Sequence, residues 1–282
     1  MPMWEQQIIQ TGRGSFEIFI KGNGTPVCVT HDYSAFNHTG DYFADTFTNQ
    51  NQVILINLKN AGNSDRAEHP HELSLIDSVL DLEEIRKQLG YTEWIYAGHS
   101  TGGMIGILYG IRYSMSLKAL ILVGTAAREY SSSSRCIYHV LHPQFKRMQE
   151  LMKLLKEPGL GEVERANLTK ERTQLSLYHA EKYEEYFSKD IRKRIVPSRL
   201  DFFSREALIY DVTRQLIRIH ARTAVLCGQY DVQCPVEFSI ELSEGIRDAY
   251  LHVFPYSNHY PHLEERRNFK RVTADFLREI EG

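Results

Sequence analysis

The stretch Gly98-His99-Ser100-Thr101-Gly102 decides the predicted fold, because it follows the apolar run of residues 94–97 and precedes a helix-like segment. The pattern Gly-x-Ser-x-Gly between a strand and a helix is typical of a nucleophile elbow, a tight turn that raises the serine above the sheet. The residues two before and two after the serine then have no room for a side chain, so glycine occupies both positions. A chance match in a glycine-bearing loop is the alternative, and the strand before and helix after the motif favour the elbow. At the start of a helix, Ser100 would meet unpaired N–H groups that favour a developing oxyanion.

Elsewhere the chain alternates between short apolar runs and amphipathic segments, a pattern typical of a mostly parallel sheet flanked by helices. Residues 6–10 and 15–21 predict an opening antiparallel hairpin punctuated by glycines. Further runs that predict strands buried on both faces are residues 27–30, 53–58, 94–97, 117–123, 223–227 and 250–254. Apolar residues at helical spacing predict helices over residues 73–89 and 261–280. The predicted fold class is therefore α/β.

Residues 126–215 interrupt this alternation. They lack strand-like runs and are rich in charged and aromatic residues, so we expect several amphipathic helices inserted between two strands. We expect a core domain built from residues 1–125 and 216–282. The inserted segment would then form a helical cap over Ser100. An independent helical domain is the alternative, and the position directly after the strand that follows Ser100 favours the cap.

A serine hydroxyl needs a histidine to take its proton and an acid to orient that histidine. Among twelve histidines, His259 lies just past the last predicted strand, where a loop would carry it toward Ser100. Asp231 follows the predicted strand of residues 223–227, in a loop that ends at Pro235. The chain order Ser100, Asp231, His259, each after a strand, predicts a catalytic triad. The alternatives are a helix N-cap or turn for Asp231 and a surface loop for His259.

The composition argues against nucleic-acid and membrane partners. The 282 residues are 42% apolar, enough for a large core, and carry a formal net charge of -3. Lys and Arg are scattered rather than gathered on one stripe, unlike those of a nucleic-acid-binding protein. No run reaches the length of a membrane span, and no basic segment precedes an apolar stretch at the N-terminus. We therefore expect a cytoplasmic protein that does not enter membranes.

Neither the cysteines nor the histidine pairs predict a metal or redox site. The four cysteines are too few and too unevenly spaced for a disulfide framework, and no C-x-x-C motif is present. The pairs His69 with His71 and His259 with His262 lack a third ligand at a recognisable spacing. We therefore expect no metal and no organic cofactor.

Together these features resemble the α/β-hydrolase fold superfamily, and most closely the capped serine hydrolases of the proline iminopeptidase-like branch. The resemblance covers nearly the whole chain. Besides residues 98–102, it rests on residues 57–65, similar to the D-x-R-G-x-G-x-S segment of that family, and on residues 228–235, similar to its acid loop. The resemblance implies that the backbone N–H groups of Tyr33 and Thr101 form an oxyanion hole.

The chain departs from that branch in two places. His31-Asp32-Tyr33-Ser34-Ala35 replaces the H-G-G-P-G of proline iminopeptidases, and the tryptophan that those peptidases tend to show shortly after the serine is missing. An inward Asp32 carboxylate would oppose a nearby oxyanion, so we expect it to point away and bond the backbone. These departures argue against peptidase activity and do not affect ester, lactone or other acyl hydrolysis.

Aromatic residues, mostly of the inserted segment, could line a substrate pocket. The substrate contacts that we predict are His99, Tyr130, Tyr183, Phe187 and Phe203. Aromatic residues at helical spacing more often build a core, so only a minority of such residues should touch substrate. Glu181, Glu184 and Glu185 could hold the free amino group of a peptide, but a solvated helix face is the better interpretation.

The predicted function is hydrolysis of a small-molecule ester, lactone or amide through an acyl-enzyme on Ser100, with His259 as general base and Asp231 orienting it. A proline iminopeptidase-like aminopeptidase acting on short peptides is the first alternative. A non-catalytic small-molecule binding protein on the same fold is the second. An acyltransferase would use the same residues while excluding water from the acyl-enzyme.

Overall fold

A mostly parallel sheet forms the centre of the protein. The computed structural model describes residues 3–157 and 159–281. Within those residues, eight strands form one sheet in the order β1-β2-β5-β3-β6-β7-β9-β10. The strands are β1 (Glu5–Thr11), β2 (Gly14–Lys21), β3 (Pro26–Thr30), β5 (Gln52–Ile56), β6 (Trp94–His99), β7 (Leu117–Val123), β9 (Thr223–Gly228) and β10 (Ala249–Phe254). β2 pairs antiparallel with β1 and β5, and every later neighbour is parallel, which confirms the α/β fold class and the opening hairpin.

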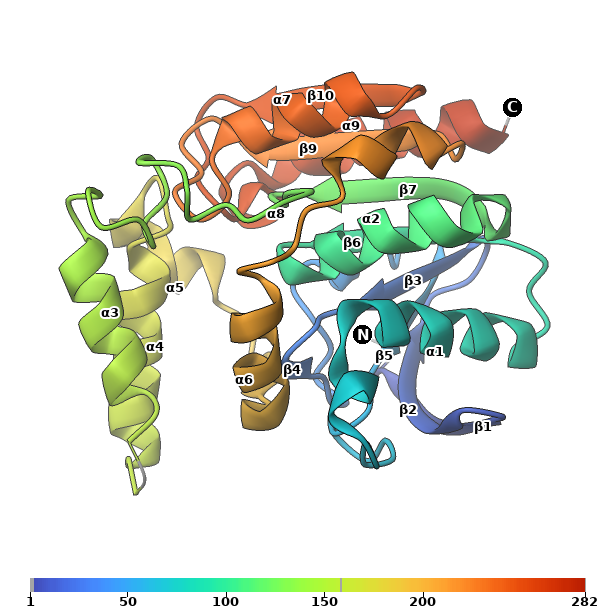
Figure 1. Cartoon of the computed structure of the whole chain (residues 1–282), viewed down its shortest axis with the longest axis horizontal. Helices are drawn as coiled ribbons and strands as arrows, with labels where there is room; N and C mark the ends of the chain where they lie inside the picture. Colours follow the sequence, from blue (N-terminus) through green and yellow to red (C-terminus); the bar gives the residue numbers. More distant parts are fainter. Residues whose placement is uncertain (1–2, 158, 282) are drawn as a thin grey trace.

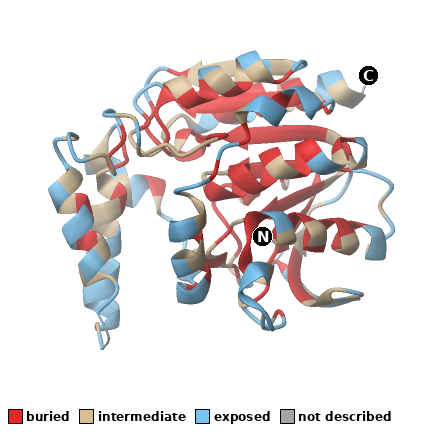
Figure 2. Ribbon diagram, in the orientation of Figure 1, coloured by how far each residue is buried: buried red, intermediate tan, exposed pale blue. Residues whose placement is uncertain are grey.

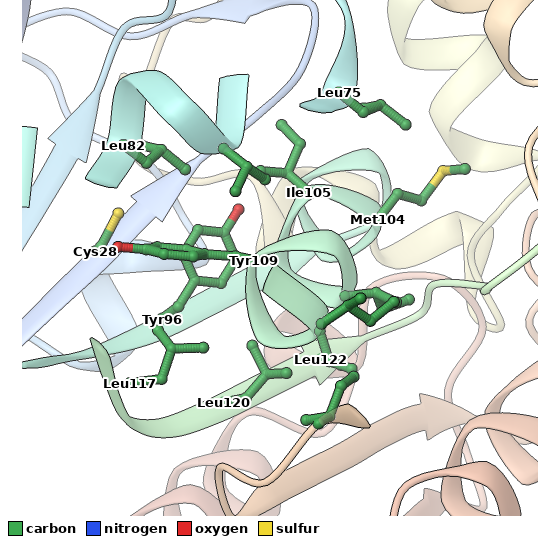
Figure 3. Close-up of a cluster of buried hydrophobic side chains, with 14 of the residues drawn as sticks. Cys28, Leu75, Leu82, Tyr96, Met104, Ile105, Tyr109, Leu117, Leu120 and Leu122 are labelled. Atoms are coloured by element: carbon green, nitrogen blue, oxygen red, sulfur yellow. The ribbon is translucent and has the colours of Figure 1, made fainter. Parts of the chain in front are cut away.

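Helices cover both faces of the sheet (Figure 1). One face carries α1 (Leu75–Gln88), α2 (Thr101–Tyr113) and α7 (Val236–Gly245), and the other carries α9 (Arg266–Glu281). Strand residues alternate between the two layers: Cys28 packs in the cluster under α1 and α2, whereas Val27 packs in the cluster that includes α9. Figure 3 shows the first cluster around α2. The central strands are buried on both faces (Figure 2), which explains their continuous apolar runs.

Two helices differ from their predicted bounds. The helix predicted over residues 73–89 begins later, because Ser74 is the N-cap of α1, its Oγ accepting the Asp77 N–H at 3.1 Å. The helix predicted over residues 261–280 is divided into α8 (Pro261–Glu264) and α9, with Glu265 between them. Helical apolar spacing runs through this break, so the sequence pattern could not reveal it.

The inserted segment lies beyond the carboxyl ends of the parallel strands (Figure 1). It contains α3 (Phe145–Leu154), α4 (Glu162–Gln174), α5 (Tyr183–Tyr186), α6 (Pro197–Glu206) and the short strand β8 (Arg194–Ile195). β8 pairs antiparallel with β4 (Ser34–Ala35), a pairing that the sequence did not predict. The two ends of the segment meet, since the Val212 N–H donates to Ala127 O at 2.8 Å. The role of residues 126–215 as a cap stays a prediction.

Short 3-10 helices complete the described structure. They are η1 (Ala44–Thr46), η2 (Pro70–Leu73), η3 (Ser114–Ser116), η4 (Ala180–Lys182) and η5 (Thr213–Arg218). Among the helices that the structure describes, none combines the length and the apolar character needed to cross a bilayer.

Candidate active site

Ser100 occupies a strained turn between β6 and α2. Its φ of 55° and ψ of -124° lie outside the regions that residues with a side chain favour. Two backbone hydrogen bonds of 2.9 Å hold the turn: the Ser100 N–H donates to Val123 O, and the Gly103 N–H donates to Ser100 O. The strain is therefore located at the residue that the sequence predicts as the nucleophile.

Glycines make this turn sterically possible. A Cβ on Gly98 would lie 2.4 Å from the Gly102 carbonyl oxygen, a backbone atom that cannot move aside. A Cβ on Gly102 would lie 2.4 Å from Thr30 O at the end of β3. A Cβ on Gly103 would lie 2.6 Å from the Thr125 side chain. The turn therefore requires the two glycines of the motif and also Gly103, which the motif does not contain.

Asp231 and His259 form a buried hydrogen-bonded pair. Asp231 Oδ2 lies 2.9 Å from His259 Nδ1, and the two side chains are 0% and 2% exposed. Asp231 Oδ1 accepts the backbone N–H groups of Gln233 and Cys234, each at 2.8 Å, which fixes the carboxylate. Because a carboxylate can only accept, His259 carries a proton on Nδ1, and its Nε2 is left to act as a base.

Two glycines give this pair its space. Gly124, directly after β7, has a φ of +52°, and a Cβ there would lie 2.9 Å from Asp231 Oδ2 and 3.3 Å from His259 Nδ1. A Cβ on Gly228 would lie 2.0 Å from Asn258 O, because the two loops cross there. Sequence reasoning assigned neither glycine this role. The available signal was a glycine at or just past the end of a buried strand.

The three predicted triad residues lie at the carboxyl ends of β6, β9 and β10. His99 links Ser100 to His259. It directly precedes Ser100 in the chain, its Nε2 lies 2.7 Å from His259 O, and its ring is 4.7 Å from the His259 ring. Burial, followed by the charges of His259 and His262, lowers the pKa of His99 well below its usual range. His99 therefore donates to His259 O as a neutral ring, and its contact with substrate stays a prediction. The structure gives no hydrogen bond between Ser100 Oγ and His259, a contact that often tightens only when substrate binds.

The predicted oxyanion donors lie close to the elbow. Thr101 is the first residue of α2, where a backbone N–H has no partner within the helix. The Thr101 Oγ1 lies 3.5 Å from the ring of His31, a residue that precedes Tyr33 by two positions. In the described residues, neither the Thr101 N–H nor the Tyr33 N–H has a hydrogen-bond acceptor. Both donors are therefore available to a ligand.

Asp32 points away from these donors, as expected, but its partner is a side chain rather than the backbone. Arg199 Nη2 lies 2.7 Å from Asp32 Oδ1, and Arg199 Nε donates to the Asp32 carbonyl oxygen. Burial raises the pKa of Asp32, and the charge of Arg199 opposes that rise. The expectation of a backbone partner is wrong because the sequence cannot show that α6 brings a guanidinium to this loop.

Phe203 and Tyr130 lie on the side of the site that carries Tyr33. The Phe203 ring, from α6, is 5.6 Å from the Tyr33 ring. Tyr130 packs against the same core cluster and is 6.2 Å from the Tyr138 ring. Phe203 is itself buried in that cluster, and contact of Phe203 or Tyr130 with substrate stays a prediction.

Tyr183 and Phe187 lie in a separate cluster. Their rings stack at 4.6 Å, and Phe187 is 5.3 Å from Tyr42 of the core and 6.0 Å from Tyr260. Tyr260 directly follows His259 in the chain. These two aromatic residues therefore pack the inserted segment against the histidine loop, and direct contact with substrate stays a prediction.

Glu181, Glu184 and Glu185 of the inserted segment are exposed. Glu184 pairs with Lys170, and Glu181 lies 3.0 Å from His179. Glu185 lines a surface cleft of about 510 Å³ between α5 and α9, which does not include Ser100. Their exposure agrees with the interpretation as a solvated helix face.

Ser176, just past α4, is a contact that sequence reasoning missed. Its carbonyl oxygen accepts the His259 N–H at 3.2 Å, and its Oγ accepts from Gln233 Nε2 at 3.0 Å. The inserted segment thus touches the loops of both Asp231 and His259, and no sequence motif marks the position. The described residues contain no group of three His, Cys, Asp or Glu that could hold a metal ion.

Comparisons with known proteins agree with this fold. The family model described as alpha/beta hydrolase fold matches residues 18–266. The chain is 26% identical over 244 residues to proline iminopeptidase PfmaB of Pestalotiopsis fici, covering 83% of this chain and 81% of that protein. It is 24% identical over 279 residues to a 2-hydroxy-6-oxo-6-phenylhexa-2,4-dienoate hydrolase of Comamonas testosteroni, covering 96% and 90%. It also resembles the solved structure of an alpha/beta fold family hydrolase from Bacillus anthracis str. Sterne, with a TM-score of 0.94, 39% identity and coverage of 97% and 99%.

Proposed function

Because the chain belongs to the alpha/beta hydrolase fold family, we propose that it is a serine hydrolase that cleaves a small-molecule ester, lactone or amide. The observation that carries the proposal is the buried Asp231–His259 pair at 2.9 Å beside the strained turn of Ser100. A protein that only binds its ligand has no need for a strained serine or for a carboxylate that orients one histidine.

The proposed reaction is two-step acyl transfer. Ser100 Oγ attacks the carbonyl carbon while His259 Nε2 takes the hydroxyl proton. The bond to the leaving group then breaks, and His259 returns that proton to the departing oxygen or nitrogen. The Tyr33 and Thr101 N–H groups donate to the oxyanion in both steps. Water, deprotonated by His259 Nε2, then attacks the acyl carbon; the bond to Ser100 Oγ breaks, the acid leaves, and His259 passes the proton to Ser100 Oγ.

We extend the proposal to residues 126–215 as a cap on a core of residues 1–125 and 216–282. Three contacts support it: Ser176 O with the His259 N–H, Arg199 with Asp32, and the pairing of β8 with β4. Each contact joins the inserted segment to a loop that carries a proposed catalytic or oxyanion group. A helical domain unrelated to the site would not need these contacts.

Aminopeptidase activity is the alternative that the relatives' names suggest, since one of them is a proline iminopeptidase. Such an enzyme needs a carboxylate near the serine to hold the free amino group of a peptide. The glutamates that could supply it, Glu181, Glu184 and Glu185, are exposed, and Glu181 and Glu184 contact His179 and Lys170. The geometry therefore favours an ester, a lactone or an amide without a free amino group.

The first test compares initial rates on a prolyl arylamide and a short-chain p-nitrophenyl ester. The variants are Ser100→Ala and, as a matched control, Ser243→Ala, whose hydroxyl donates to a carbonyl within α7. We expect ester turnover in the wild type and in Ser243→Ala, and its loss in Ser100→Ala. Amide turnover that depends on Ser100 would favour the aminopeptidase. Absence of any turnover that depends on Ser100 would overturn the proposal in favour of a binding protein.

A further inference from the structure

Arg172 lies in the last turn of α4, four residues before Ser176, which contacts the loops of the proposed triad. Residues four apart project from the same side of a helix, and Ser176 follows Arg172 by four positions. The helical turn continues to Ser176, whose N–H donates to Thr173 O at 2.9 Å. Arg172 is therefore about one turn away from a residue that contacts the loops of His259 and Gln233.

The positive charge of Arg172 acts on phenol groups that come from three different segments. Burial raises the pKa of Tyr33 to about 12, and the charge of Arg172 opposes the rise. Burial likewise raises the pKa of Tyr138 and Tyr260, and Arg172 is the largest opposing influence on each. Tyr33 precedes β4, Tyr138 belongs to the inserted segment, and Tyr260 follows His259. The charge of Arg172 therefore acts on groups of both the oxyanion loop and the histidine loop.

No carboxylate pairs with Arg172 among the residues that the structure describes, although its neighbours are paired. Arg147 lies 2.6 Å from Glu171, and Lys170 pairs with Glu184. These pairs are on exposed surface, whereas Arg172 is partly buried. A cation that is removed from water without a partner is unfavourable unless a ligand supplies the opposite charge.

Two carboxylates next to the histidine loop have other partners. Asp231 is bound to His259 and to two backbone N–H groups. Glu264 accepts the backbone N–H groups of Tyr178, Asn258 and Tyr260 at 2.6, 3.0 and 3.2 Å. Neither is free to turn toward Arg172 without breaking contacts that hold the histidine loop.

We propose that Arg172 binds a carboxylate of the substrate, so that the enzyme prefers acyl compounds that carry a free carboxylate beyond the cleaved bond. This inference rests on the proposed hydrolase function and names its substrate class. A guanidinium presents a planar fork of donors that matches a carboxylate, and the nearby phenol hydroxyls add further donors. The same charge repels a free amino group, which further disfavours the aminopeptidase alternative.

The test uses matched ester pairs that differ only in charge. The p-nitrophenyl monoesters of adipate, pimelate and suberate carry a free carboxylate, and their methyl p-nitrophenyl diesters do not. We expect Arg172→Gln to lower kcat/KM for the acids by about 10- to 100-fold, because a charge-assisted hydrogen-bonded pair is lost. We expect the neutral diesters to change by less than about 3-fold, with Arg172→Lys intermediate on the acids.

Arg147→Gln is the matched control, since this cation of α3 is paired with Glu171 and Glu150 on the surface. It should leave both substrate classes unchanged. The ratio of the two kcat/KM values cancels any general loss from altered folding. An equal loss on acids and diesters in Arg172→Gln, at every chain length, would overturn the inference.

A binding measurement separates this inference from the proposed function. Calorimetric titration of monomethyl and dimethyl adipate, pimelate and suberate into Ser100→Ala needs no turnover. Tighter binding of the monoacids that disappears in Ser100→Ala/Arg172→Gln would support the carboxylate site even if no ester is hydrolysed. Equal binding of monoacids and diesters, or binding that Arg172→Gln leaves unchanged, would show that Arg172 does not select charge.

Discussion

Asp32 and Arg199 form an ion pair that is almost completely removed from solvent. The distance from Arg199 Nη2 to Asp32 Oδ1 is 2.7 Å, and the side chains are 0% exposed for Arg199 and 1% for Asp32. Arg199 Nη2 also donates to Ser78 Oγ at 2.8 Å. Asp32 directly precedes Tyr33, and Arg199 lies in α6. The pair therefore ties the inserted segment to the loop that carries a proposed oxyanion donor.

Replacing Arg199 should destabilise the protein strongly. Arg199→Met leaves the Asp32 carboxylate buried without its partner, and we expect the free energy of unfolding to fall by about 3–5 kcal/mol. The double variant Asp32→Asn/Arg199→Met should recover part of this loss, because it removes the unpaired charge. Urea unfolding followed by circular dichroism measures both. The control is Arg205→Met, which removes an exposed cation of the same helix and should lower the free energy of unfolding by less than about 0.5 kcal/mol.

The sequence predicted the parts of the site that depend on local geometry. Ser100, Asp231 and His259 could be chosen because each follows an apolar run that predicts a strand, and because the elbow needs glycine at 98 and 102. The carboxyl ends of parallel strands share one edge of the sheet, so chain order was enough to bring them to one region. Their assignment as a catalytic triad stays a prediction.

Contacts between distant segments could not be predicted. Asp32 and Arg199 are 167 positions apart, and no periodicity links them. Ser176 follows the polar helix α4, and nothing in the sequence marks its contact with His259. The close approach of the Gly228 and Asn258 backbones likewise leaves no pattern in the sequence.

Gly124→Ala should abolish most activity at a small cost in stability. The new Cβ would lie 2.9 Å from Asp231 Oδ2 and 3.3 Å from His259 Nδ1, so the pair must shift. The matched control is Gly90→Ala, which has a similar φ of +78° with nothing within 4 Å of its Cβ. In both variants the free energy of unfolding should fall by about 1–2 kcal/mol, because alanine disfavours the left-handed backbone. Only Gly124→Ala should lower kcat by more than about 10-fold. Equal kcat in the two variants would contradict this account.

Asp231→Asn should lower kcat while the protein stays folded. An amide of the same shape can keep the Gln233 and Cys234 N–H contacts, but it no longer holds His259 with its proton on Nδ1. We expect kcat for a p-nitrophenyl ester to fall by about 10²- to 10⁴-fold. Asp248→Asn, which alters an exposed carboxylate 4.0 Å from Arg222, is the control and should leave kcat unchanged. A loss of less than about 3-fold in Asp231→Asn would remove this residue from the proposed mechanism.

His262 should make the protein sensitive to acid. Its side chain is buried, and its Nδ1 has no hydrogen-bond partner in the described structure. Burial lowers the pKa of His262 from 6.5 to about 3; the Asp41 carboxylate opposes this, and the charges of Lys193, His259 and Arg266 add to it. Between these two pKa values the unfolded chain binds a proton that the native protein does not. Stability from this group is therefore present above pH 6.5 and is lost as the pH falls toward 3.

Replacing His262 by phenylalanine should remove that part of the acid sensitivity. The ring packs 5.4 Å from Phe43 and 5.9 Å from Phe269, so a benzene ring fits the same aromatic surroundings without titrating. At pH 5.5 the wild type should have lost about 1.4 kcal/mol through His262 relative to pH 7.5, and His262→Phe should not lose this amount. Urea unfolding at the two pH values measures the difference. The same loss of stability in both proteins would mean that His262 is protonated in the native state well above pH 3, and that Asp41 rather than burial controls its charge.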